Sequence, residues 1–302
     1  MKHFTLADYP IAGKTVLVRV DYNVPLKNGK IEDNTKIRAS LPTIKFLLNH
    51  ECKIILATHL GDPKGKFVPE LKTDVLIKAL QILLPKNIIT KVNDCIVKEI
   101  KEQIKISSNK QIFLLENLRF YKEEEENDSA FAHSLADLAE VYVNDAFGVS
   151  HRNHASVSAI TQFIPSVSGM LMERELSHLS QAFSEIHPNI WIMGGAKLDK
   201  IDLINTALKR ADLILIGGAL AFSFLKAQGI NVGMSKIDVN SIAVAKEILD
   251  KYPEKIILPI DFIVAEEFNM NAKTSVAWYN KIGNNQIALD IGPGSIDLFE
   301  RY

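Results

Sequence analysis

The chain has 302 residues, enough for two ordinary domains or one large one. Hydrophobic residues make up 47% and charged residues 24%, a balance typical of globular proteins. The net charge of −1 argues against a general binder of nucleic acid or of anionic membranes, and two cysteines are too few for a disulfide framework. With no secretory signal and no apolar run long enough to span a bilayer, we expect a cytoplasmic protein.

In the first half of the chain, short apolar runs alternate with amphipathic stretches. The apolar runs predict strands at Lys14–Val20, Lys53–Ala57, Ile112–Leu115 and Val141–Val143. Helical spacing predicts helices from Asn34 to Asn49, from Asp74 onward, and through Phe131, Leu135 and Leu138. The acidic run Glu123–Glu126 is typical of a solvated helix start more than of a metal site. Strands separated by helices of this length indicate parallel βαβ units.

The alternation loosens at Gln162–Ser168, and a long amphipathic helix then reaches about Phe183. After it the pattern restarts. Strands are predicted at Ile190–Met193, Leu213–Ile216, Ile256–Pro259 and Ile287–Ile291, and helices at Leu198–Leu208, Ala219–Ala227, Ile242–Leu249 and from Ser295. We therefore predict an α/β fold of two Rossmann-like parallel-sheet domains, residues 1–168 and 186–302, joined by a helical hinge at residues 169–185.

Polar side chains follow the predicted strands of the first half. Because ligands of open α/β sheets bind at the carboxyl ends of strands, these side chains are candidates for one site. A lone arginine or histidine is more often an ordinary surface or core residue, and only the shared position favours a ligand. Arginines with a histidine suit a phosphorylated, carboxylated small molecule, and acidic or amide side chains suit its hydroxyls. The set is Asp21, Asn23, Arg38, His59, Arg119, His151 and Arg152.

In the second half, glycine pairs follow two strands and precede helices. They are Gly194-Gly195, with Lys197 close behind, and Gly217-Gly218. Glycine allows phosphate to approach the backbone at a helix amino terminus, although tight strand-to-helix turns use glycine anyway. A phosphorylated acid in one half and nucleotide phosphates in the other suggest a two-domain enzyme of phosphoryl transfer, with closure about the hinge helix.

Eight specific segments follow one another along the chain: RVDYNVP (19–25), THLGDPKG (58–65), LLENLRFYKEEE (114–125), VNDAFGVSHRNHAS (143–156), GGAKLDK (194–200), IGGALAFSFLK (216–226), LPIDFIVA (258–265) and LDIGP (289–293). In this order they resemble the phosphoglycerate kinase family over essentially the whole chain. The resemblance implies phosphoryl transfer between 1,3-bisphosphoglycerate and ADP in glycolysis, giving 3-phosphoglycerate and ATP with Mg²⁺. We also expect a monomer that binds no nucleic acid and no membrane.

Site residues follow from the same resemblance. Asp21 and Asn23 would hold the hydroxyl and carboxylate end of the glycerate, and Arg38 would offset the charge of the transferring phosphoryl group. The basic cluster is completed by His59, Arg119 and Arg152. Nucleotide phosphates would meet Gly194, Gly195, Lys197 and Lys200, with Lys197 also on the transferring group, and the adenosine side would meet Gly217 and Gly218.

The sequence departs from the family at three places. Asp62 stands where many members have arginine, which exchanges a substrate-binding cation for an anion, and Lys64 or Lys66 is a candidate replacement. GGAKLDK is one residue short between its lysines, which changes the helical position of Lys200. The family's Trp-Asn-Gly-Pro segment and its glycine-rich turn with a metal-binding aspartate do not occur before Tyr302. We therefore expect an incomplete second sheet with partly uncovered apolar surface.

Two other functions compete with the kinase. One is a non-catalytic protein that keeps the glycerate site without a working nucleotide domain. The other is a nicotinamide dehydrogenase, which is disfavoured because the GxGxxG motif and its downstream acidic residue are not evident.

Overall fold

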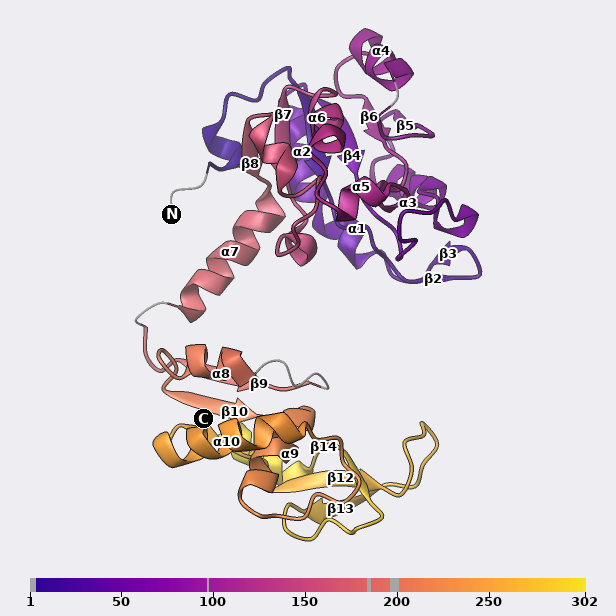
Figure 1. Ribbon diagram of the computed structural model, residues 1–302. Helices are drawn as coiled ribbons and strands as arrows, with labels where there is room; N and C mark the ends of the chain where they lie inside the picture. The colour runs from indigo at the N-terminus through magenta and orange to yellow at the C-terminus, as the bar shows by residue number, and fades with distance from the viewer. Residues whose placement is uncertain (1–3, 97, 184–185, 196–200) are drawn as a thin grey trace. The chain divides into compact units, whose positions relative to one another are not determined.

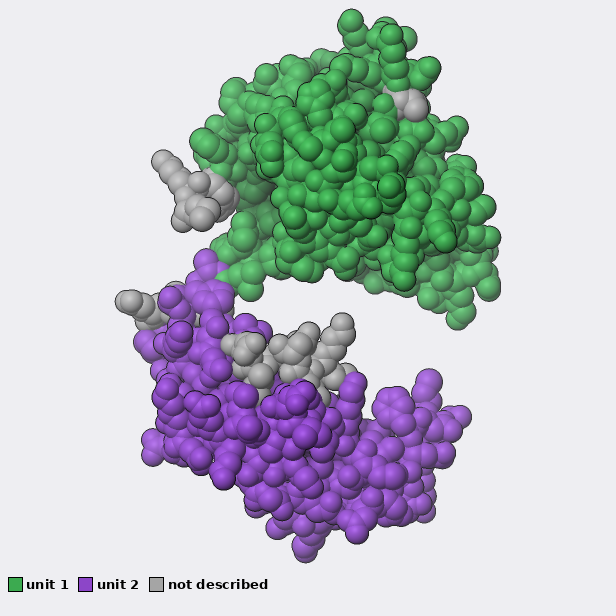
Figure 2. All heavy atoms as spheres, in the orientation of Figure 1, with its two compact units in different colours: residues 1–179 green, residues 180–302 purple. Residues whose placement is uncertain are grey.

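The computed structural model describes residues 4–96, 98–183, 186–195 and 201–302. Contacts divide the chain into two compact units, Met1–Leu179 and Ser180–Tyr302, which Figures 1 and 2 distinguish. Both units are α/β, so the predicted fold class is confirmed. Among the described residues, no helix is both long and apolar enough to cross a membrane.

The first unit is built on a six-stranded parallel sheet in the order β5-β6-β4-β1-β7-β8 (Figure 1). The central strand β1 pairs with β4 on one side and with β7 on the other, so the strand order reverses here. The strands are β1 (Thr15–Arg19), β4 (Lys53–Ala57), β5 (Ile89–Lys91), β6 (Ile112–Leu114), β7 (Val141–Asn144) and β8 (Ser166–Ser168). A short antiparallel hairpin, β2 (Leu26–Lys27) and β3 (Lys30–Ile31), follows β1.

Successive side chains of each strand face opposite cores, as the period of two requires. Val16 and Val18 of β1 join one core, to which α2 and α3 contribute, and Leu17 joins the other, to which α4 and α6 contribute. Both faces of the sheet are therefore covered. The helices of this unit are α1 (Thr35–Ala39), α2 (Leu41–Asn49), α3 (Asp74–Leu83), α4 (Lys98–Ile106), α5 (Lys122–Glu125) and α6 (Ser129–Ala136), with short 3₁₀ turns that include η3 (Leu118–Phe120), η4 (Phe147–Val149) and η5 (Ala159–Gln162). Helix α7 (Met170–Ala182) begins in this unit and crosses the boundary at Leu179.

One predicted helix is two. The stretch from Asn34 to Asn49 divides at Ser40 into α1 and α2. Pro42 lies in the first turn of α2, where its missing N–H interrupts the hydrogen bonds of a continuous helix. The hydroxyl of Ser40 bonds the carbonyl of Ile37 and the phenol of Tyr22 instead.

The second unit contains two three-stranded sheets. A parallel sheet has the order β11-β10-β9, and an antiparallel sheet has the order β13-β12-β14. The strands are β9 (Ile190–Met193), β10 (Leu213–Ile216), β11 (Ile256–Ile257), β12 (Asp261–Ala265), β13 (Ser275–Trp278) and β14 (Ile287–Ile291), and the helices are α8 (Ile201–Ala207), α9 (Gly218–Ala227), α10 (Val239–Lys251) and α11 (Pro293–Phe299). The sequence predicted parallel sheets, and the antiparallel sheet was not predicted.

Strand β9 has one strongly exposed apolar side chain. Ile192 is 77% exposed, whereas Met193 next to it is buried. Leu198–Leu208 was predicted as a helix, and its first residues lie outside the described ones.

Candidate active site

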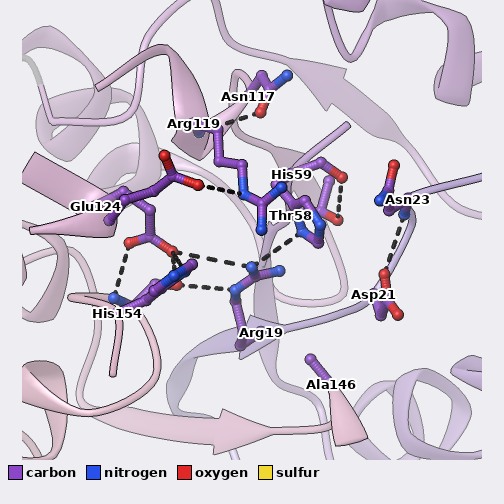
Figure 3. Close-up of polar contacts among 12 residues, drawn as sticks. Arg19, Asp21, Asn23, Thr58, His59, Asn117, Arg119, Glu124, Ala146 and His154 are labelled. Atoms are coloured by element: carbon purple, nitrogen blue, oxygen red, sulfur yellow. Dashed lines mark hydrogen bonds and ion pairs between the residues drawn. The ribbon is translucent and has the colours of Figure 1, made fainter. Parts of the chain in front are cut away.

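The carboxyl ends of β1, β4, β6 and β7 bring polar side chains to one edge of the first sheet (Figure 3). The loop after β1 is tied to the loop after β4, since Asn23 Oδ1 accepts a hydrogen bond from the backbone N–H of Gly61 at 2.8 Å. Asp21 Oδ2 forms an ion pair with Lys36 Nζ at 2.8 Å, from helix α1. The predicted meeting of strand ends is therefore present in the structure.

His59 lies at the centre of this edge and is 2% exposed. Its Nδ1 lies 3.2 Å from Nη2 of Arg19, which ends strand β1. Burial, and then the positive charges of Arg19, Arg119, Arg152 and Lys36, lowers the pKa of His59 to about 2. The imidazole is therefore neutral across the physiological range.

Arg119 is also buried, at 4% exposure, and in Figure 3 its side chain comes toward His59 from above while Arg19 comes from below. Nη1 donates to the carbonyl of Gly61 at 3.0 Å, and Nε lies 3.3 Å from a carboxylate oxygen of Glu125. Burial lowers the pKa of the guanidinium. Nε and Nη2 have no hydrogen-bond partner among the described residues. Such donors suit an anionic ligand.

Glu124 was predicted to lie on a solvated helix start, and its own side chain contradicts this. It is fully buried in α5. Its carboxylate accepts hydrogen bonds from the backbone N–H of Ser156 at 2.9 Å and from the Ser156 hydroxyl at 2.6 Å, and it lies 3.9 Å from Nη2 of Arg19. A buried arginine requires a compensating charge, and Glu124 supplies it.

Asn117 organises the neighbouring loops. Its amide group donates to the carbonyls of Leu60 and Leu71 at 2.8 and 2.9 Å, and its Oδ1 accepts from the backbone N–H groups of Leu60 and Arg119 at 3.2 and 3.1 Å. The loops after β4 and β6 are thus held together by one side chain.

The arginines predicted outside this buried centre are exposed. Arg38 Nε donates to Asn34 Oδ1 at 2.9 Å on its own helix, while Lys36 reaches Asp21. Arg152 is exposed as well, although its charge acts on His59. Sequence reasoning missed Arg19, Lys36 and Glu124. For Lys36, the signal available was its position on the same predicted helix as Arg38.

In the second unit, the glycine pairs lie at adjacent strand ends. The N–H of Gly217 donates to the carbonyl of Met193 at 2.8 Å. A Cβ on Gly218, whose φ is +58°, would lie 2.7 Å from the nitrogen of Gly195, and a Cβ on Gly194 would lie 3.0 Å from the oxygen of Gly217. Glycine is therefore required where these two turns pack together. Lys197 and Lys200 lie outside the described residues.

No group of three or more histidine, cysteine, aspartate or glutamate side chains is placed to hold a metal ion in the described parts of the chain. Those residues do not by themselves fit a resident metal, and we assign no protein ligand for Mg²⁺.

Comparison with known proteins agrees with this arrangement. The family model described as phosphoglycerate kinase matches residues 6–302. The chain belongs to the phosphoglycerate kinase family. It is 46% identical to the phosphoglycerate kinase of Dictyoglomus turgidum over 299 residues, which cover 97% of this chain and 75% of that protein. It is 44% identical to that of Moorella thermoacetica over 298 residues, which cover 97% of this chain and 76% of that protein.

Solved structures of the family superimpose on the chain. The structure of phosphoglycerate kinase from Coxiella burnetii matches with a TM-score of 0.83 and 31% identity, covering 99% of this chain and 77% of that one. That from Pyrococcus horikoshii matches with a TM-score of 0.85, 29% identity and the same coverage. Family membership confirms the resemblance seen in the sequence and makes the chain an enzyme, a phosphoglycerate kinase of glycolysis and thus a phosphotransferase.

Proposed function

We propose that the chain transfers a phosphoryl group between 1,3-bisphosphoglycerate and ADP, giving 3-phosphoglycerate and ATP. The supporting observation is the gathering of cationic side chains around His59, beside Asp21 and Asn23, at one edge of the first sheet. The first domain, residues 1–168, binds the glycerate. The connector is residues 169–185, and the second domain, residues 186–302, binds the nucleotide.

The glycerate site divides into polar and cationic parts. Asp21 and Asn23 bind the hydroxyl and carboxylate end. Arg119 offers Nη2, which has no hydrogen-bond partner among the described residues, to an anionic group, and His59 offers an uncharged donor. Lys36, Arg38 and Arg152 add positive charge from the rim. Lys36 has the closest contact of these to the strand-end loop, through Asp21.

The nucleotide site is proposed around the glycine turns of the second unit. Gly194 and Gly195 lie beside the nucleotide phosphates and Gly217 and Gly218 line the adenosine side, while Lys197 and Lys200 neutralise phosphate charge. Magnesium arrives with ATP or ADP, and no step is assigned to it.

In the transfer itself, the bond between phosphorus and the carboxyl oxygen breaks while a bond to a terminal phosphate oxygen of ADP forms. Such reactions depend on positioning and on charge stabilisation more than on a protein nucleophile. Arg38 and Lys197 are proposed to offset charge on the transferring group, and Lys36 shares this role because of its position. We also propose a cytoplasmic monomer whose partners are small molecules, without nucleic acid or membrane.

A coupled assay of ATP-dependent 3-phosphoglycerate turnover, with calorimetry of 3-phosphoglycerate and of ADP, tests this proposal. Lys36→Met should weaken 3-phosphoglycerate binding roughly 10-fold or more, because a charge-assisted contact is lost. The control is Lys45→Met, an exposed lysine on α2. Glycerate binding without turnover would support the non-catalytic alternative, and absence of glycerate binding would refute the site.

Asp62 raises a separate question about the cation it replaces. Its Oδ1 lies 3.8 Å from Nη1 of Arg119, and its side chain is 60% exposed. Lys64 and Lys66 are exposed on the same loop. We propose that they supply the missing positive charge. If Lys64→Ala and Lys66→Ala both leave 3-phosphoglycerate affinity unchanged, this replacement is wrong.

A further inference from the structure

The contact between Arg19 and His59 restricts where the imidazole carries its proton. A guanidinium can only donate hydrogen bonds. Because Nη2 of Arg19 lies 3.2 Å from Nδ1 of His59, Nδ1 must be the acceptor. A proton on Nδ1 would place two donors against each other in a buried site. The remaining ring nitrogen, Nε2, then carries the hydrogen.

Arg19 is held so that it cannot turn away. It is 1% exposed, its Nη1 donates to the carbonyl of Val20 at 2.7 Å, and its Nε donates to the hydroxyl of Ser156 at 2.8 Å. The Ser156 hydroxyl donates in turn to Glu124 at 2.6 Å. The hydrogen bonds therefore run in one direction, from Arg19 through Ser156 to the carboxylate of Glu124.

The charges that face His59 also disfavour a second proton. Arg19 comes from β1, Lys36 from α1, Arg119 from η3 and Arg152 from the loop after η4. All of these are cations, and burial together with their charge holds the pKa of His59 near 2. Glu124, the buried carboxylate of this network, contacts Arg19 and Ser156.

We propose that Arg19, oriented by Ser156 and Glu124, holds His59 as the neutral tautomer with hydrogen on Nε2. The three residues are positioning residues, since they act through His59. The tautomer adds detail to the proposed glycerate site. It depends on that site only for the ligand: the ligand atom that meets Nε2 must be a hydrogen-bond acceptor, such as a carboxylate or phosphate oxygen. His59 contributes a fixed neutral donor, and the net positive charge of the site comes from arginine and lysine alone.

The ligand-free chain of 302 residues tests the tautomer directly. With ¹⁵N-labelled histidine, a long-range ¹H–¹⁵N correlation spectrum distinguishes protonated from unprotonated ring nitrogens. The chain has eight histidines, and the signals missing from His59→Phe identify this one. We expect a protonated Nε2 and an unprotonated Nδ1, unchanged from pH 5 to pH 8. A proton on Nδ1, or a titration within that range, would overturn the proposal.

Ser156→Ala tests the orienting chain, with the neighbouring Ser158→Ala as the matched control. Loss of the Ser156 hydroxyl removes the acceptor of Arg19 Nε and a donor to Glu124. We expect His59 signals of both tautomers in Ser156→Ala and the original spectrum in Ser158→Ala. If Ser156→Ala gives the spectrum of the unsubstituted protein, Ser156 does not position Arg19.

Calorimetry separates this inference from the proposed function. Loss of one hydrogen bond to a charged ligand oxygen in His59→Phe should weaken 3-phosphoglycerate binding about 12- to 160-fold. The ratio to the unsubstituted protein should be equal at pH 5.5 and pH 8.0, because protonation of the ligand affects both proteins alike. A larger ratio at pH 5.5 indicates a cationic His59 and contradicts the tautomer. If the unsubstituted protein does not bind 3-phosphoglycerate, the proposed function fails, and the spectrum still decides the tautomer.

Discussion

Replacement of Glu124 by glutamine is the most demanding test of the buried network. Glutamine keeps the shape of the side chain but removes the charge that lies 3.9 Å from Arg19. In the unsubstituted protein both carboxylate oxygens accept hydrogen bonds from Ser156. Glutamine turns one of these acceptors into an NH₂ group. The substitution therefore leaves a buried guanidinium without its counter-charge and sets two donors against each other.

The magnitude follows from these losses. Breaking a buried ion pair by neutralising one partner costs about 3–5 kcal/mol, and an unsatisfied buried donor costs about 1–3 kcal/mol. These costs belong to one network and do not add. We expect the free energy of unfolding of the first unit to fall by about 3–5 kcal/mol. With a urea slope of about 3 kcal/mol per M, the midpoint should fall by roughly 1–1.7 M.

The assay must report the first unit specifically. Both tryptophans, Trp191 and Trp278, lie in the second unit, so tryptophan fluorescence reports that unit and serves as an internal control. Hydrogen exchange of peptides from β1 and β4, followed by mass spectrometry over a urea series, reports the first. The exposed Glu126→Gln is the matched control and should change stability by less than about 0.5 kcal/mol. A midpoint for Glu124→Gln within about 0.3 M of the unsubstituted protein would refute the reasoning.

Three further outcomes are expected. Asp62→Asn removes a carboxylate 3.8 Å from Arg119 and should tighten 3-phosphoglycerate binding by about 2- to 5-fold in calorimetry; unchanged affinity would show that Asp62 does not compete with the ligand. Burial raises the pKa of Asp145 to about 6, so its protonated form is favoured on folding. Its contribution to the free energy of unfolding is complete below the unfolded pKa, near pH 4, and about 3 kcal/mol is lost as pH rises through 6. Urea titrations should show this decline relative to Asp145→Asn, and parallel pH curves would contradict it. Gly218→Ala should destabilise the second unit by about 1–3 kcal/mol, measured by tryptophan fluorescence, because φ is +58° and the new Cβ would lie 2.7 Å from a backbone atom. Gly217→Ala, with open space around its Cβ, should be tolerated, and equal effects of the two substitutions would be inconsistent with this geometry.

The sequence predicts the central strands well because they are buried on both faces. Lys53–Ala57 is confirmed to the residue, since a contiguous apolar run has few alternatives in an α/β protein. Strand β5, which was not predicted, contains Ile89, Thr90 and Lys91, all half-buried at the edge of the sheet. One apolar residue among three gives no periodic signal.

The site was predictable as a set of strand ends, but not in its charges. Arg19 and Ser156 are hydrogen-bonded across 137 positions of the chain, and no local spacing reveals such a contact. Lys36 and Arg38 lie two positions apart on one helix, so they point in different directions. Which of them faces Asp21 depends on how α1 packs, and tertiary structure alone decides this.

The alternation of strand β1 has a consequence for how this protein can change. Leu17 and Arg19 point to the same side of the sheet, so the rotation that buries Leu17 also delivers the guanidinium to Ser156. Inserting or deleting one residue within β1 would send Arg19 toward the opposite layer and would exchange the partners of Val18 and Leu17 as well. The position of the Arg19 guanidinium and the packing of β1 therefore depend on the same alternation of side chains along the strand. Insertions are tolerable in the loop after Pro25, where the hairpin already extends the chain, but not in the five residues before the site.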